Sequence, residues 1–438
     1  MNQLQVGFAR MDVTPMTGIG LIGYYHERLA NGVLDPLELN AMAIACGDDR
    51  VVLITMDQEG LTRDCCQDFK NYISQVTGLP EQAIYIHATH THTGPYVVKD
   101  SENPLEREYY TFLYRRMGDV AKYALADLTP ARMGYGVGTS PEIAFVRRYR
   151  MKDGSIQTNP WRQNPNVVEP IGITDHRVNV LRFDREDGQT LILANFGNHP
   201  DVIGGCRFSA DWPGFTRRTL EQALPGSKCI FFNGAQGDVN HIDIRIPEDG
   251  FNDGYEYSRH MGRVVAGTVL QVFDKVVYAD VDSLRYKQTT VHVPAKRPTP
   301  EQIEQAKIIK EIHESGRDDE LPYRGMMRIT VVAEAINFVE LEHGPDSFEM
   351  DLSGIAIGNV VLIGIPGEPF SGIGLGLKEA EGWDLILPTC LTNGKHGYFP
   401  MQEAFDEGGY ESRSSRFQAG VAEYLIAEGK KLMADLRK

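Results

Sequence analysis

The sequence predicts an α/β protein in which largely buried β-sheet layers of mixed strand direction are flanked by helices. Residues 191–196, 228–232 and 360–365 form almost continuous apolar runs, which are typical of strands covered on both faces. Each run ends directly in a glycine-containing segment that carries polar residues. Because sites in open α/β sheets collect beyond the carboxyl ends of the strands, we expect the functional site where these runs end.

Composition excludes several classes of partner. The chain has 438 residues, of which 42% are hydrophobic and 24% charged, as in ordinary globular proteins. The 44 Lys and Arg residues against 60 Asp and Glu residues give a net charge of −16. There is no basic cluster, so we expect no nucleic-acid partner and no stable membrane association. A small-molecule substrate remains the expected partner, and a homo-oligomer stays open.

The compartment follows from the chain start and from the cysteines. The residues after Met1 show neither a positive segment nor an apolar run, so the sequence predicts no signal peptide. No apolar run approaches the roughly 20 residues of a membrane span. The six cysteines have no regular spacing and no CxxC pair, which favours reduced thiols. These features together predict a cytoplasmic protein.

The first 60 residues are expected to form a strand, an irregular loop and two further strands. The two later strands cover residues 41–46 and 51–56, around a turn at 47–49. Residues 18–23 match the dinucleotide-binding pattern G-x-G-x-x-G. They follow Pro15 instead of a strand and open no helix, so we interpret them as a flexible glycine loop. A helix over 63–77 is expected next.

Three histidines, His87, His90 and His92, fall within six residues, directly after the apolar residues 83–86. Residues two apart on an extended segment share a face, so His90 and His92 can look into one cleft. Neutral imidazole is the commonest metal ligand and a natural base near pH 7. A polar strand end with structural histidines is the alternative, but three imidazoles so close together favour a functional site.

The rest of the chain is expected to contain further helices and strands in one domain spanning 1–438. A helix covers 106–125, and residues 131–185 are rich in strands with long loops, including the tryptophan-bearing loop 158–170. Residues 298–320 read as a charged helical surface insertion whose helix runs to about 315, and Thr299 to Gln302 supply its capping pattern. An amphipathic helix over 414–438 ends the chain.

The polar residues at the strand ends suit a catalytic zinc site. Such sites use three nitrogen or oxygen ligands and leave a position for water, and the candidates are His90, His199 and Glu368. Bound zinc lowers the pKa of its water to about 7, and His92 is placed to take the proton. No spacing rule joins these distant residues, and singly His199 reads equally well as a structural loop residue.

A developing oxyanion needs hydrogen-bond donors, for which Arg147 or Arg148 and a tyrosine are candidates.

Residues 89–95, THTHTGP, resemble the THTHSGP signature of the neutral/alkaline (non-lysosomal) ceramidases. The resemblance runs through most of the chain, and its ordered set of motifs is highly specific. The further motifs are DVTP at 12–15, NHP at 198–200, SADWPGF at 209–215, GDVN at 237–240, IPGE at 365–368, and the tyrosines Tyr398 and Tyr410, twelve residues apart.

The resemblance implies a complete site. Zinc would be held by His90, His199, Glu368 and Tyr398, although Tyr398 without the resemblance would be read as a packing aromatic. The resemblance also implies His92 as the general base and Tyr410 and Arg147 as stabilisers of the oxyanion, with Arg148 as the alternative arginine. Asp211, Asp238 and Asn240 would orient ligands or loop backbone.

The leading hypothesis is a zinc-dependent amidohydrolase that cleaves a linear N-acyl amide through a metal-activated water. The sequence predicts neither the signal peptide nor the immunoglobulin-like domain of secreted ceramidases, so we expect a smaller and more polar amide than ceramide. An esterase or lactonase on the same site is a close variant. A metal-dependent phosphoesterase would need carboxylates for a second metal, such as Asp57, Asp211 and Asp238. A non-catalytic zinc-binding protein is the third alternative, but it would have no need of His92 and Tyr410.

Overall fold

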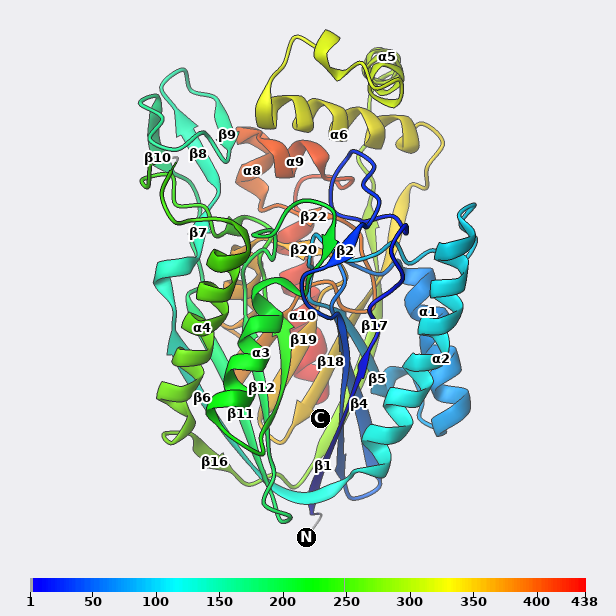
Figure 1. Cartoon of the computed structure of the whole chain (residues 1–438), viewed down its shortest axis with the longest axis vertical. Helices are drawn as coiled ribbons and strands as arrows, with labels where there is room; N and C mark the ends of the chain where they lie inside the picture. The colour runs from blue at the N-terminus through cyan, green and yellow to red at the C-terminus, as the bar shows by residue number, and fades with distance from the viewer. Residues whose placement is uncertain (1–2, 248) are drawn as a thin grey trace.

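A computed structural model describes residues 3–247 and 249–438. Met1 and Asn2 belong to the chain start from which no signal peptide was predicted, and they lie outside the described residues. Two β-sheets pack face to face, and helices cover the outer face of each sheet (Figure 1). The order of the four layers is therefore helices, large sheet, small sheet, helices. The predicted fold class, α/β with buried mixed sheets between helices, is confirmed.

The large sheet has nine strands within the described residues, in the order β14-β12-β11-β6-β1-β3-β4-β5, with β16 paired to β6. Most neighbours are antiparallel, while β12 and β14 and also β4 and β5 run parallel. The strands are β1 Leu4–Asp12, β3 Glu38–Cys46, β4 Asp49–Met56, β5 Ile84–Ala88, β6 Thr129–Thr139, β11 Arg177–Arg185, β12 Thr190–Phe196, β14 Lys228–Asn233 and β16 Val277–Ala279.

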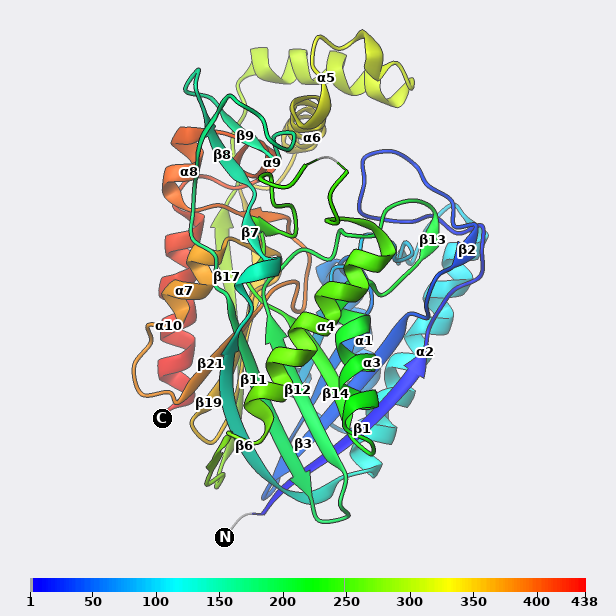
Figure 2. The same ribbon diagram turned by 60° about the vertical axis from the view of Figure 1, so that its left-hand side comes forward.

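Four helices cover the outer face of the large sheet. One half of the face carries α1 and α2, and the other half carries α3 and α4, as Figure 2 shows. Strand β12 illustrates why the apolar runs are continuous: Leu191 and Leu193 point into the core between the sheets, while Ile192 and Ala194 pack beneath α3 and α4. The helices are α1 Arg63–Thr77, α2 Pro104–Ala126, α3 Asp211–Ala223 and α4 Gly254–Phe273.

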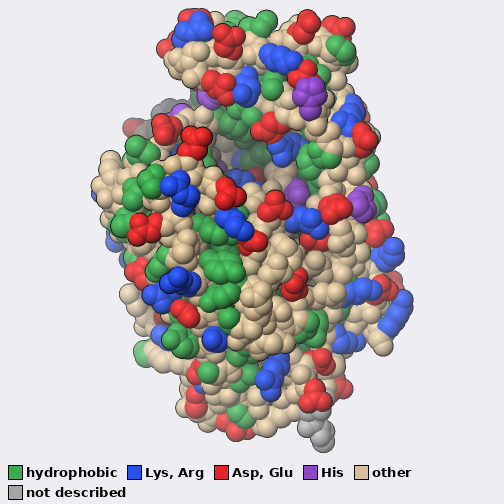
Figure 3. Space-filling view, turned by 90° about the vertical axis from the view of Figure 1, so that its right-hand side faces the viewer, with side chains coloured by type: hydrophobic (Ala, Val, Ile, Leu, Met, Phe, Trp, Pro, Cys, Tyr) green, Lys and Arg blue, Asp and Glu red, His purple; other side chains and the backbone are tan. Residues whose placement is uncertain are grey.

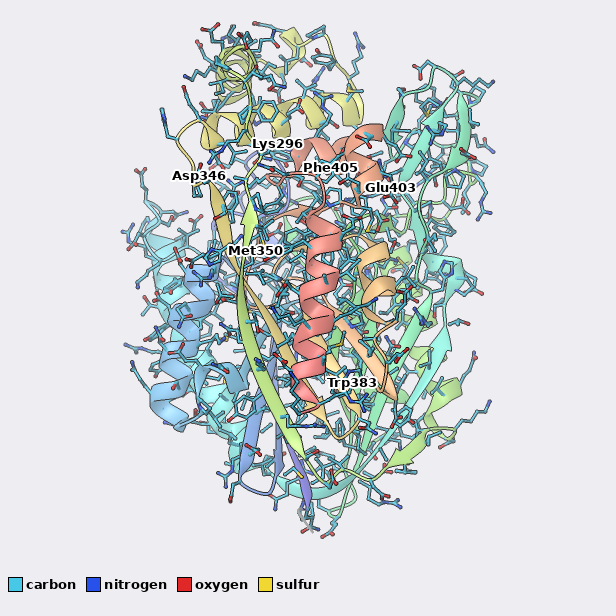
Figure 4. All side chains as sticks on the ribbon, turned by 180° about the vertical axis from the view of Figure 1, so that it is seen from behind. Lys296, Asp346, Met350, Trp383, Glu403 and Phe405 are labelled. Atoms are coloured by element: carbon cyan, nitrogen blue, oxygen red, sulfur yellow. The ribbon has the colours of Figure 1, made fainter. Side chains whose placement is uncertain are left out.

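The small sheet has the order β17-β18-β19-β21, with β19 and β21 parallel. Helix α10 lies across its outer face, in front of the strands in Figure 4. The elements of this layer are β17 Leu284–Pro294, β18 Ser347–Ile357, β19 Val360–Gly364, β21 Leu385–Thr389, α7 Ser371–Leu377, α8 Gln402–Glu407, α9 Tyr410–Ser414 and α10 Val421–Leu436.

Short strand pairs and single turns join these layers at the end where β5, β12 and β19 finish. They are β2 Gly32–Val33 with β13 Arg207–Phe208, β7 Phe145–Val146 with β15 Val239–Asn240, β20 Glu368–Pro369 with β22 Tyr398–Phe399, and the three-stranded group β8 Arg148–Met151, β9 Ile156–Thr158 and β10 Val167–Pro170.

The charged insertion is longer than predicted. Its first helix is α5, Pro300–Glu314, and Thr299 and Gln302 form the expected capping box. The prediction stops at 320 and misses α6, Gly325–Leu341. Apolar residues lie on several faces of α6, so it lacks the single stripe that helical periodicity detects. Together α5 and α6 form a hairpin above the sheets (Figure 1).

The predicted terminal helix over 414–438 begins too early. Its described helix, α10, starts at Val421 and follows Gly420, which has a φ of 91°. The preceding helix α9 ends at Ser414, and the Ser415 hydroxyl donates to the Tyr398 carbonyl instead of continuing a helix. A buried Phe417 anchors the connection.

Two further observations concern the cysteines and membrane spans. All six cysteines are free thiols, and only Cys206 is not fully buried. None of the described helices is both long enough and apolar enough to cross a membrane.

A buried ion pair ties α3 to the end of β4. Arg217 is fully buried, and its guanidinium donates to both oxygens of Asp57, at 3.0 and 2.5 Å, and to Glu38 at 3.0 Å. Removing the cation leaves buried Asp57 without its ionic partner, while Glu38 keeps Arg10 at 3.4 Å.

We therefore expect Arg217→Met to lower the free energy of unfolding by about 3–5 kcal/mol, measured by urea denaturation. Arg116→Met is the matched control, because Arg116 pairs with Asp119 on the surface and exposed pairs contribute about 0–1 kcal/mol. Equal stabilities of the two variants would contradict this account.

Candidate active site

The candidate site lies where strands of both sheets finish, below the α5–α6 hairpin. His90 follows β5, His199 follows β12, and Glu368 follows β19. Glu368 also begins the short strand β20, in which it is the register partner of Tyr398 on β22. Figure 3 shows that the molecule is hollowed below the hairpin on the face it presents. Four segments far apart in the chain thus supply one site.

His90 and His92 lie next to each other, but not because they alternate along an extended strand. Strand β5 ends at Ala88, and His90 has a φ of 78°, in the left-handed region that side chains rarely adopt. The Nε2 atoms of His90 and His92 are 3.3 Å apart. The His90 N–H donates to the Gln58 carbonyl at 2.7 Å, which helps to hold this strained turn. The expectation of an extended segment is therefore wrong, because the chain turns at His90.

Three donor atoms converge on one point. Glu368 Oε2 lies 3.2 Å from His90 Nε2 and 3.3 Å from His199 Nε2. All three side chains are buried, and Glu368 Oε2 has no hydrogen-bond partner among the described residues. Lone pairs this close repel one another unless a proton or a cation lies between them.

Backbone carbonyls set the orientation of the two imidazoles. His90 Nδ1 lies 2.7 Å from the Glu59 carbonyl, and His199 Nδ1 lies 2.9 Å from the Gln236 carbonyl. A carbonyl only accepts, so each Nδ1 carries the hydrogen and each Nε2 presents its lone pair. Burial and the Arg147 guanidinium lower the pKa of His199 to about 3, which keeps that ring neutral.

This donor set fits zinc. Ligand atoms at about 2.0–2.1 Å from a tetrahedral zinc ion lie roughly 3.3–3.4 Å apart, which matches the separations of Glu368 Oε2 from both Nε2 atoms. His90, His92 and His199 also form a cluster whose ligand atoms lie within 4.8 Å of one another. Glu368 Oε2 contacts both His90 and His199, whereas His92 Nε2 lies 3.3 Å from His90 Nε2 and its ring centre lies 5.9 Å from that of His199.

Tyr398 and Arg147 stand beside this cluster. The Tyr398 ring stacks near His199, with ring centres 6.4 Å apart, and Arg147 lies 5.2 Å from the Tyr398 ring centre. Arg147 Nη1 is 3.4 Å from His199 Nε2, and Arg147 Nε donates to Glu411 at 2.7 Å. Burial raises the pKa of the Tyr398 phenol well above its usual range, and Arg147 opposes that shift.

The two candidate arginines point in different directions. Arg147 points to the site, whereas Arg148 donates to Glu407 and to the Gly408 carbonyl. Tyr410, at the start of α9, lies with its ring centre 5.5 Å from that of Tyr398, and its hydroxyl is 3.3 Å from the Tyr25 hydroxyl.

His92 is held against the glycine loop. Gly23 has a φ of 112°, and a Cβ placed there would lie 2.9 Å from His92 Cγ. Burial, with a smaller effect of His90, lowers the pKa of His92 to about 3. Residues 18–23 thus do not form the strand-to-helix turn of a dinucleotide-binding motif, and they pack against the site. The rejection of a dinucleotide-binding turn in favour of a loop is confirmed, but the loop is packed and not free, since Ile19 and Leu21 are buried.

His87 is engaged elsewhere. Its Nδ1 bonds with the Thr55 hydroxyl at 3.1 Å, and its Nε2 accepts the Asn233 N–H at 3.1 Å. Burial lowers the pKa of His87 to about 3. Both ring nitrogens are therefore used in the core.

The carboxylates that a second metal would need are committed to structural bonds. Asp57 is held by Arg217, and Asp238 accepts from the amide and the hydroxyl of Ser371. Asp211 accepts three backbone N–H groups and the Ser258 hydroxyl, and two of those amides belong to the loop after His199. Asn240 instead donates to Asn159. This arrangement disfavours the two-metal phosphoesterase hypothesis.

Sequence reasoning missed Glu411 and Asp201. Glu411 is fully buried and receives both Arg147 and the Thr158 hydroxyl. Asp201 lies 3.5 Å from His92 Nδ1. Glu411 directly follows Tyr410, and Asp201 directly follows the NHP motif at 198–200. This neighbourhood in the chain was the only signal in the sequence.

Within the described residues, Tyr410 lines three cavities. The first, of about 200 Å³, is bounded by His92, Arg147 and Tyr398. The second, of about 490 Å³, opens onto His90, His92 and Glu368, and its wall carries the ion pairs Glu59–Lys395 and Glu340–Arg416. The third, of about 570 Å³, is largely apolar and lies between α6 and the tryptophan-bearing loop. Its apolar side chains are Ile156, Trp161, Met326, Met327 and Ile329.

Fold and site together define an α/β protein of four layers with a buried His–His–Glu cluster at its strand ends. Solved ceramidases have the same fold. Neutral ceramidase from Pseudomonas aeruginosa matches with a TM-score of 0.75 and 16% sequence identity, over 100% of this chain and 75% of that chain. A ceramidase complexed with C2 matches with a TM-score of 0.74 and 16% identity, over 100% and 76% of the two chains.

The resemblance inferred from the motifs is thus confirmed at the level of the fold. No protein-family model and no curated protein matches the sequence.

Proposed function

We propose that this protein is a zinc-dependent amidohydrolase that cleaves a linear N-acyl amide bond. One observation carries the proposal: Glu368 Oε2 lies 3.2 Å from His90 Nε2 and 3.3 Å from His199 Nε2. The ceramidase fold of the solved neighbours supports the same reaction class. Zinc would be held by His90, His199 and Glu368, with Tyr398 as the fourth ligand.

When bound, zinc supplies Lewis acidity that lowers the pKa of a coordinated water to about 7. The chain's own residues do the rest. We assign the role of base to His92, because its Nε2 lies 3.3 Å from His90 Nε2 at the cluster. It takes the proton of the attacking water and returns it to the leaving amine. Arg147 and Tyr410 donate hydrogen bonds to the oxyanion that develops at the acyl carbon.

Burial supports this division of roles. The Arg147 guanidinium is paired with the buried Glu411 carboxylate, to which its Nε donates, so its positive charge is compensated beside the site. Its guanidinium is thereby preorganised, and a preorganised donor in a site shielded from water is worth far more than the same donor in solvent. Tyr410 keeps its proton, since burial raises its pKa well above the usual range, and so it acts as a donor.

The two larger cavities indicate the substrate class. The charged wall of the 490 Å³ cavity suits a polar amine portion, and the apolar 570 Å³ cavity beside Tyr410 suits an acyl group. A second long alkyl chain, as in ceramide, would have to displace water from two ion pairs without replacing their hydrogen bonds. The preferred substrate is therefore an N-acyl compound with a small polar head group.

The test is metal analysis combined with a hydrolysis screen. We expect one zinc ion per chain and turnover of N-acyl compounds with polar head groups, abolished by a chelator and restored by added zinc. Acyl length and head group are varied separately, and matched esters form a parallel series. Finding no zinc, or two ions per chain, would contradict the site, and ester turnover without amide turnover would favour the esterase variant.

A further inference from the structure

Asp201, Tyr24 and Arg28 surround His92 with contacts that zinc binding alone does not require. Asp201 Oδ1 lies 3.5 Å from His92 Nδ1, on the opposite edge of the imidazole from the Nε2 that faces His90. His92 Nδ1 is buried and has no hydrogen-bond partner among the described residues at this separation. The carboxylate of Asp201 is an acceptor close to hydrogen-bonding distance of this nitrogen.

Asp201 is itself fixed by the loop that carries residues 18–31. The Tyr24 hydroxyl donates to Asp201 Oδ1 at 2.6 Å, and the Tyr24 ring meets His92 edge-on, with centres 5.6 Å apart. His26 stacks parallel to Tyr24, with ring centres 5.7 Å apart. One aromatic side chain therefore contacts both the imidazole and the carboxylate.

Arg28 locks the same loop to the backbone of His92. Its guanidinium lies 4.0 Å from the Tyr24 ring centre and donates to the carbonyls of His92, Ile22 and Gly205, at 2.7, 2.6 and 2.9 Å. The last of these belongs to the segment that follows Asp201. Backbone, ring and carboxylate are thus held by one connected set of contacts.

We propose that Asp201 is a positioning residue that holds His92 in the tautomer with hydrogen on Nδ1, leaving the Nε2 lone pair free to take a proton. The inference rests on the proposed function, because it assumes that His92 is the base. A neutral imidazole carries one ring hydrogen, and the acceptor on one nitrogen decides where it sits. After proton transfer both nitrogens are donors, and the carboxylate then also stabilises the imidazolium.

The separation of 3.5 Å is consistent with this role, since catalytic hydrogen bonds are often long before substrate binds and tighten in the complex. The Asp201 side chain keeps a third of its surface exposed, so it has room to close on His92.

Asp201→Asn tests the inference, because an amide can donate to Nδ1 and so favours the wrong tautomer. We expect kcat to fall about 10- to 100-fold, while KM and zinc content stay unchanged, and Asp201→Glu to recover part of the loss. Asp68→Asn is the matched control: Tyr110 donates to Asp68 at 3.0 Å, in a pair between α1 and α2, and its loss should leave kcat unchanged.

Nitrogen-15 NMR of the zinc-loaded protein, in which the metal would occupy the His90 Nε2 lone pair that faces His92 Nε2 at 3.3 Å, supplies a readout that does not depend on turnover. We expect His92 to carry its hydrogen on Nδ1 in the native chain and to shift toward Nε2 in Asp201→Asn. An unchanged kcat, or an unchanged tautomer, would overturn the role of Asp201. A native protein without hydrolase activity whose tautomer still depends on Asp201 would support the positioning and overturn the proposed function.

Discussion

Replacing His92 with alanine will lower kcat by about 10²- to 10⁴-fold, the usual contribution of a general base, while the protein keeps its zinc. The reason is geometric. His92 Nε2 lies 3.3 Å from His90 Nε2 and is free of backbone partners, whereas His90 and His199 have their Nδ1 atoms tied to carbonyls and their Nε2 atoms aimed at Glu368. Removing His92 deletes the proton acceptor and spares the proposed ligands.

Zinc content and turnover must be measured on the same preparation of His92→Ala. The matched control is His343→Ala, on an exposed side chain, which should leave both quantities unchanged. If His92→Ala loses its zinc together with its activity, the metal is held by the three-histidine cluster instead, and the base lies elsewhere. Full activity with bound zinc would remove His92 from the mechanism.

Glu368→Ala will release zinc and reduce hydrolysis to the level of the metal-free protein. Glu368 Oε2 is the atom that both imidazoles face. Its negative charge compensates the zinc dication, which would otherwise lose its hydration in a buried site without an anionic ligand. Without it, two neutral imidazoles and one phenol that burial keeps protonated would remain. The expected zinc content falls from one ion per chain to almost none, measured by elemental analysis after dialysis.

Glu340→Ala provides the comparison, because Glu340 is a carboxylate of the same cavity that pairs with Arg416. It should retain one zinc ion. A Glu368→Ala protein that binds zinc as tightly as the native chain would show that Glu368 is not a ligand.

Much of the fold followed from local patterns. Helix α1 has the predicted bounds, because Thr62 caps its start and Gly78 ends it in the left-handed conformation. The buried strands β12, β14 and β19 were predictable because both of their faces are apolar. The order of the strands and the packing of two sheets against each other were not, since they depend on contacts between residues far apart in the chain.

The site was predictable in part for the same reason. Polar residues after buried strands identify where a site gathers, and the motif resemblance pointed to Tyr398 and Tyr410. The left-handed turn at His90 has no such signal, because histidine rarely adopts it. Asp201 reaches His92 only through the fold of the loop at 18–31, so no spacing in the sequence indicates their contact.

The α5–α6 hairpin leaves and rejoins the small sheet at neighbouring points. Pro294, the last residue of β17, is the register partner of Ser347, the first residue of β18. A chain that departs and returns at paired positions can be lengthened, shortened or exchanged without shifting the strands on either side. Under the proposed function, the wall that α6 contributes to the 570 Å³ cavity can therefore change without moving His90, His199 or Glu368.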